Sequence, residues 1–138
     1  MVTLMLDSAH LEVVLSITEK GLAFRKRNVM IDRSQIVRVQ LTDDAWTWLR
    51  GVPDPGTYLP VAIAAGSWKS AGGRDFVSIR RRKPSVVIDL EGSDDFQRLI
   101  LTTSHGVALV QALRLETGSE PIDVVDLATE DKKRKRSS

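Results

Sequence analysis

The sequence contains no cysteine, only two histidines and few aromatic residues. Without cysteine the chain cannot form a disulfide scaffold, a thiolate zinc site, an iron–sulfur cluster or a cysteine nucleophile. Neither His10 nor His105 stands at metal-ligand spacing, so we expect no metal and no cofactor. The low aromatic content leaves little material for stacking bases, and specific nucleic-acid binding is not expected.

Long apolar runs are also missing. The longest, Leu59–Ala65, is far shorter than the roughly 20 residues that a membrane-spanning helix needs. The amino terminus has no basic region, and Asp7 ends its apolar stretch early, which is not typical of a signal peptide. We therefore expect a cytoplasmic protein.

The length of 138 residues fits one domain, and 42% hydrophobic residues can form a core. Five of the 20 basic residues gather near the carboxyl terminus: Lys132, Lys133, Arg134, Lys135 and Arg136. Residues 1–131 keep 15 basic against 18 acidic residues, a net charge of −3, so the high pI comes from this end. We expect a folded domain over 1–118 and an extended, largely disordered basic tail over 119–138.

The first half of the chain alternates apolar and polar residues with the period of two that is typical of strands. Gly21 stands where a turn would need a positive φ, which predicts a hairpin over 11–25 with Leu22 and Phe24 facing inward. Further strands are expected over 29–32, 36–41, 61–68, 75–81, 85–90 and 96–102. Three prolines and two glycines predict an irregular segment over 42–60.

The pattern changes to helical spacing after Thr103. Ser104 can cap a helix over 105–115, whose apolar side would carry Leu109, Val110 and Leu113. Gly118 and Pro121 lie beyond its end. A series of short strands followed by one helix favours a barrel or sandwich with the helix covering one open end.

Three segments resemble the bacterial pleckstrin-homology (PH)-like domains, in particular the small standalone actinobacterial members. They are 15–24, similar to the opening hairpin of that family, 29–39, similar to its short strand and bend, and 99–113, similar to its last strand and closing helix. The resemblance implies a mainly β fold, a seven-stranded, partly open barrel or sandwich capped by one C-terminal α-helix. It also implies a non-catalytic module that binds a protein partner or assembles with itself as a homo-oligomer.

No group of residues forms a catalytic constellation in the sequence. Ser104 and His105 are adjacent, but adjacency does not align a nucleophile with a base. The pairs Asp43–Asp44 and Asp94–Asp95 stand at expected strand ends, where aspartate is common in turns. Gly66 and Gly72–Gly73 are read as hairpin glycines, because no phosphate-binding motif accompanies them.

Two clusters of cations are candidate anion-binding sites. Arg80, Arg81, Arg82 and Lys83 end an expected strand, and Arg25 and Arg27 lie in an earlier turn. Such clusters can bind phosphate, an anionic lipid headgroup or nucleic acid, or they can form solvated turns that prevent strand edges from pairing.

Trp46 and Trp48 are candidate interface residues. In an extended segment they would face the same way, either toward a partner or a membrane, or over the end of the core. The basic run 132–136 has two interpretations as well, a contact with an anionic surface or a solubilising terminus. The sequence thus leaves two functions open: a protein-binding or scaffolding module, and a peripheral membrane or anion-binding domain.

Overall fold

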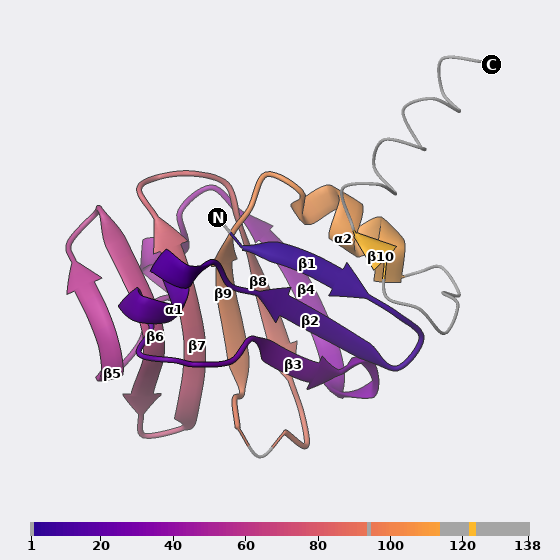
Figure 1. The fold of residues 1–138 in the computed structure, drawn as a ribbon, viewed down its shortest axis with the longest axis horizontal. Helices are drawn as coiled ribbons and strands as arrows, with labels where there is room; N and C mark the ends of the chain where they lie inside the picture. The colour runs from indigo at the N-terminus through magenta and orange to yellow at the C-terminus, as the bar shows by residue number, and fades with distance from the viewer. Residues whose placement is uncertain (1, 94, 114–121, 124–138) are drawn as a thin grey trace.

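The computed structural model describes residues 2–93, 95–113 and 122–123 (Figure 1). Their strands form two sheets. The smaller has the order β10 (Ile122–Asp123), β1 (Thr3–Leu6), β2 (His10–Val14), β3 (Val29–Asp32). The larger has the order β4 (Ile36–Thr42), β8 (Ser85–Leu90), β9 (Arg98–Thr102), β7 (Gly73–Arg80), β6 (Ile63–Ser70), β5 (Val52–Leu59).

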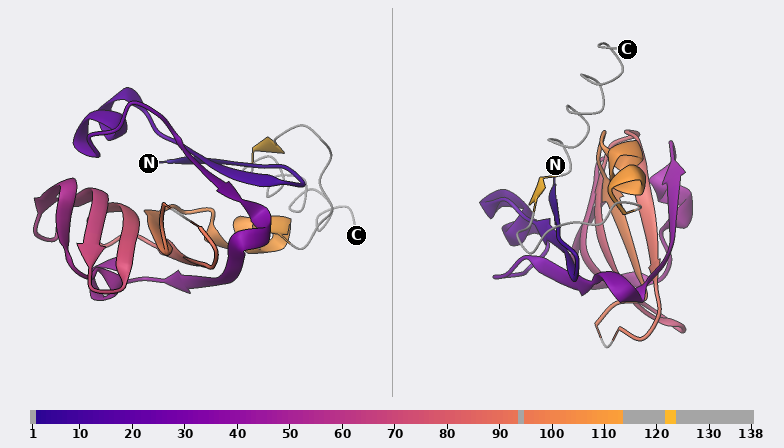
Figure 2. Two further views of the ribbon diagram at one scale, coloured as in Figure 1. Left: turned by 90° about the horizontal axis from the view of Figure 1, so that it is seen from below. Right: turned by 90° about the vertical axis from the view of Figure 1, so that its right-hand side faces the viewer.

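The two sheets are the layers of a sandwich. The chain passes from the smaller to the larger sheet through the short 3-10 helix η1 (Arg33–Gln35), which Figure 2 shows at one side of the molecule. Neighbouring strands are antiparallel except β7 and β9, which pair in parallel. The mainly β class with a C-terminal helix is confirmed. The seven-stranded barrel is not, because the described residues form ten strands in two separate sheets.

The main core lies between the two sheets. Leu6, Leu11 and Val13 of the smaller sheet and Phe76 and Leu99 of the larger are completely buried there. Burial of each such side chain stabilises the fold by about 1.5–3 kcal/mol. The expected helix is confirmed as α2 (Gly106–Leu113), and it packs into the same core.

A second core covers the outer face of the larger sheet. Since strand residues alternate between faces, Val77, Val87 and Ile100 point away from the smaller sheet and are completely buried on the other side. The 3-10 helix η2 (Ala45–Trp48) lies over them. The larger sheet is therefore apolar on both faces, which explains the nearly continuous apolar runs of β8 and β9.

The expected hairpin over 11–25 is wrong. β2 ends at Val14, and α1 (Ile17–Leu22) follows. Ser16 and Glu19 form a capping box: the Ser16 hydroxyl accepts from the Glu19 amide at 3.1 Å, and the Ser16 amide donates to the Glu19 carboxylate at 3.1 Å. These local hydrogen bonds favour a helix start over a continued strand. Gly21 has no positive φ, and Phe24 is exposed rather than inward.

The expectation of an irregular segment over 42–60 is also wrong in its second half. β5 contains Pro53 and Pro55, and it is tolerated because it is the edge strand of the sheet and shifts register between Pro53 and Gly56. Gly66 lies inside β6, not in a hairpin turn. A Cβ on Gly66 would lie 2.5 Å from the carbonyl oxygen of Pro55, so only glycine allows the strands to approach there.

The other expected strands are confirmed, with ends shifted by a few residues. The expected domain boundary at 118 falls outside the described residues. Within the expected tail, Ile122 and Asp123 pair with Leu6 and Met5 of β1. The remaining tail residues, including 132–136, also lie outside the described part.

Candidate binding surface

The tip of the β5–β6 hairpin exposes four consecutive apolar residues. Tyr58, Leu59, Pro60 and Val61 are all exposed, and the exposed fractions of Leu59 and Val61 are 54% and 50%. A hydrogen bond of 2.9 Å from the Ala62 amide to the Leu59 carbonyl closes the turn. Exposed apolar runs of this length are unusual on a surface that has no partner.

The backbone at this tip is strained. Val61 has a φ of 62°, which a β-branched residue rarely adopts. Ala62 accepts a hydrogen bond of 2.9 Å from the Arg81 amide, and Arg81 itself has a φ of 47°. Two non-glycine residues with positive φ thus lie next to each other in neighbouring turns. Strain of this kind gathers at functional sites more often than elsewhere.

Four cations adjoin the apolar tip. The β7–β8 turn carries Arg80, Arg81, Arg82 and Lys83, and both turns lie at the upper end of the larger sheet in Figure 1. Arg80, Arg81 and Lys83 line a hollow of about 300 Å³ together with Ala62 and Ile63. No ion pair with these four cations is found among the described residues. We call residues 58–61 and 80–83 the rim.

Trp46 holds the two parts of the rim together. Its indole Nε1 donates to the Arg81 carbonyl at 2.8 Å, and its ring centroid lies 6.2 Å from that of Tyr58. Tyr58 in turn makes an edge contact with buried Trp68. Both Trp46 and Trp48 are half-buried and pack against the second core, on the outer face of the larger sheet. They lie in a 3-10 helix, so the extended geometry assumed for them is wrong.

Arg25 and Arg27 do not join the rim. The Arg25 guanidinium lies 5.7 Å from the ring centroid of Phe76 and 5.6 Å from that of Phe96, and its Nε donates to the Arg27 carbonyl. Arg25 therefore covers the edge of the main core by its cation–π contacts. The structure does not bring the two clusters of cations together.

Two ion pairs on the outer face of the larger sheet were not predicted from the sequence. Arg50 binds the buried carboxylate of Asp75 with two hydrogen bonds of 2.7 and 3.0 Å, and these bonds raise the pKa of the Arg50 guanidinium. Arg98 donates to Asp89 at 2.7 Å and lies 5.4 Å from the Trp48 ring centroid. Both pairs anchor the segment that carries η2 on the sheet, so their role is structural.

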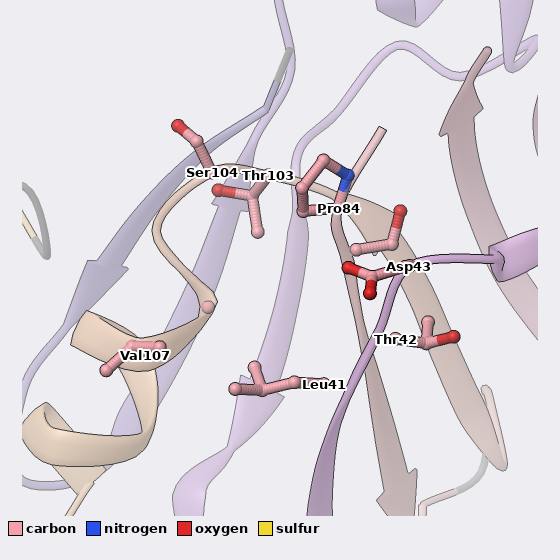
Figure 3. Close-up of a pocket in the computed structure, with 9 residues that line it drawn as sticks. Leu41, Thr42, Asp43, Pro84, Thr103, Ser104 and Val107 are labelled. Carbon is pink, nitrogen blue, oxygen red and sulfur yellow. The ribbon is translucent and has the colours of Figure 1, made fainter. Parts of the chain in front are cut away.

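A pocket of about 270 Å³ opens beside α2 (Figure 3). The carboxylate of Asp43 points into it, whereas the hydroxyl of Ser104 points away. Thr103 accepts a hydrogen bond from the His105 amide, and Ser85 bonds to Lys83 and Thr102. The pocket therefore has one carboxylate and no aligned base and nucleophile. Among residues 2–93, 95–113 and 122–123, no cluster of metal-binding side chains is found.

Comparisons with protein-family models, curated proteins and solved structures return no match for this chain. No helix within the described segments is both long and apolar enough to cross a membrane. Among the described surfaces, the rim is the one whose chemistry suggests a function. Its apolar half was missed in the sequence because the prolines around it were read as a sign of irregular structure. The four consecutive apolar residues Tyr58–Val61, two residues before the start of β6, are the signal that could have revealed it.

Proposed function

We propose that the protein is a non-catalytic binding module whose rim docks on an anionic lipid surface. The observation that carries the proposal is the contact of an exposed apolar hairpin tip with four cations that have no ion pair in the described structure. This combination matches the boundary of a bilayer, where apolar side chains enter the acyl region and cations meet phosphate groups.

The energies are sufficient for reversible binding. A basic residue close to an anionic leaflet contributes about 1 kcal/mol. Burying the exposed halves of Leu59 and Val61 contributes about 1 kcal/mol each, from the area that a full aliphatic side chain buries. Tyr58 is suited to the headgroup level, since its ring is apolar and its hydroxyl is polar. Asp43 and Asp44 lie beyond Pro84 and reduce the local positive charge without pairing with the four cations.

Charge reversal on the rim tests the proposal in the full-length protein. The double variant Arg82→Glu, Lys83→Glu should lower the partition coefficient on phosphatidylserine-containing vesicles at least about thirtyfold, because two attractive contributions are lost. The measurement is co-sedimentation at low and high salt. Lys26→Glu with Lys69→Glu is the matched control, since both lysines are exposed and lie away from the rim. An unchanged coefficient would contradict the proposal and assign lipid binding to the tail 132–136.

The apolar half has its own test. Leu59→Ser with Val61→Ser should weaken binding about thirtyfold at every salt concentration, because two apolar contributions of about 1 kcal/mol each are lost. Val52→Ser with Met30→Ser removes apolar groups of similar exposure elsewhere and should leave binding unchanged. Equal losses in both double variants would show that the hairpin tip has no particular role.

We also propose the PH-like assignment for this chain. The mainly β sandwich and the C-terminal helix in the main core support it. The parallel pair β7–β9 departs from an antiparallel barrel. The expectation of protein contacts or self-assembly stays a prediction, and the feature that favours it is the outer edge of β4, with which no other described strand pairs.

A further inference from the structure

The two edges of the larger sheet differ in how they are protected. β5, at one edge, contains two prolines and a register shift, and both features prevent another strand from pairing with it. β4, at the other edge, contains neither proline nor lysine in its seven residues. Its register shift lies at its start, between Ile36 and Arg38, and the segment 38–42 is regular. Among the described strands, β4 pairs only with β8.

Two of the exposed side chains beside this edge are apolar. Leu41 is 52% exposed and Val107, in the first turn of α2, is 58% exposed. The two lie on the same side of the pocket in Figure 3. Val39 points to the same face of the sheet as Leu41 and packs partly against the core. A strand added to β4 would cover these residues.

The edge of β4 is complementary to itself. If two copies pair antiparallel with Gln40 opposite Gln40, Val39 of each copy lies opposite Leu41 of the other. Arg38 then lies opposite Thr42, and its guanidinium is directed toward the carboxylate of Asp44, two residues further along the same face. Neither Arg38 nor Asp44 has an ion pair within the described residues. The pairing therefore joins apolar with apolar residues and opposite charges with each other at both ends.

We propose that β4 pairs antiparallel with β4 of a second copy, so that the two larger sheets become one continuous sheet. The contact is independent of the rim and needs no lipid. A five-residue strand pair with the Leu41–Val107 patch is smaller than the roughly 800 Å² per partner of a standard interface, so the dimer is reversible and depends on concentration.

Sedimentation equilibrium of the full-length protein without lipid tests this directly. The wild type should dimerise with a dissociation constant below about 1 mM. Leu41→Lys should raise this constant at least about tenfold, because a lysine on an edge strand opposes pairing. Val52→Lys makes the same change at a similarly exposed position on β5 and should have no effect. Circular dichroism verifies that each variant is folded.

A charge swap gives a second measurement if Leu41→Lys fails to fold. Arg38→Glu should weaken the dimer, since it brings carboxylates together at both ends, and Arg38→Glu with Asp44→Lys should restore it. A wild type that stays monomeric to about 1 mM would overturn the proposal. So would a dimer that only Val52→Lys dissolves, or one that Arg38→Glu alone leaves unchanged. None of these results affects the lipid test, because the rim variants are scored on vesicles.

Discussion

At the scale of single residues, the ion pair of Arg50 with Asp75 joins a buried carboxylate to a partly exposed guanidinium. Asp75 is only 1% exposed, whereas the Arg50 side chain is 39% exposed. The carboxylate has lost its water and depends on the guanidinium for compensation. Because the Arg50 side chain still reaches solvent, we expect the contribution of this ion pair to stability to lie between that of a fully exposed pair and that of a fully buried pair.

Asp75→Asn should therefore lower the free energy of unfolding by about 2–4 kcal/mol, measured by urea denaturation. The comparison is Arg74→Gln, which breaks the exposed pair of Arg74 with Asp54 and should cost less than about 1 kcal/mol. Equal losses in the two variants would show that burial of Asp75 does not decide the strength of its pair.

At the scale of elements, α2 has one large side chain that is completely buried in the core. Leu109 is 0% exposed, whereas Leu113 is only partly buried. Leu109→Ala should destabilise the fold by about 2–5 kcal/mol, and Leu113→Ala by less, as measured in denaturant melts. A loss below about 0.5 kcal/mol for Leu109→Ala would contradict the packing of α2 in the main core.

The elements also show how far the sequence could predict this fold. β8 and β9 were predictable because their short apolar runs match burial on both faces of the sheet, and α2 because the helical spacing of its apolar residues matches its buried side. α1 was not, because the alternation of 11–17 continues into it and Ile17 is then exposed; the pair Ser16 and Glu19 was the signal of a helix start. β5 was missed because prolines exclude a central strand but not an edge strand. Which strand becomes an edge depends on the tertiary arrangement.

For the site, the sequence identified the cations of 80–83 and Trp46 but not what joins them. The contact of Trp46 with both Arg81 and Tyr58 links residues up to 35 positions apart. Such contacts follow from the pairing of β6 with β7, which brings the hairpin tip beside the β7–β8 turn. No local pattern in the sequence encodes that neighbourhood.

At the scale of the whole molecule, the two proposed contacts have a joint geometric consequence. Antiparallel pairing of β4 inverts one copy relative to the other, so the two rims of a dimer lie at opposite ends. A dimer should therefore bind two bilayers and cluster phosphatidylserine vesicles, as measured by turbidity. Leu41→Lys should abolish clustering while co-sedimentation persists, and Arg82→Glu with Lys83→Glu should abolish both. Clustering that survives Leu41→Lys would contradict this arrangement.

The order of strands in the larger sheet also determines when its strands can pair while the chain is being synthesised. β8 and β9 lie between β4 and β7, although they are the last strands of that sheet to leave the ribosome. Until they arrive, β4 has no neighbour, the β5–β6–β7 meander lacks one side, and the smaller sheet has no complete layer to cover it. Pairings between segments so distant in the chain form slowly and leave apolar surface open in the meantime. The nascent chain must therefore keep its apolar strands from wrong partners until residue 102 has emerged.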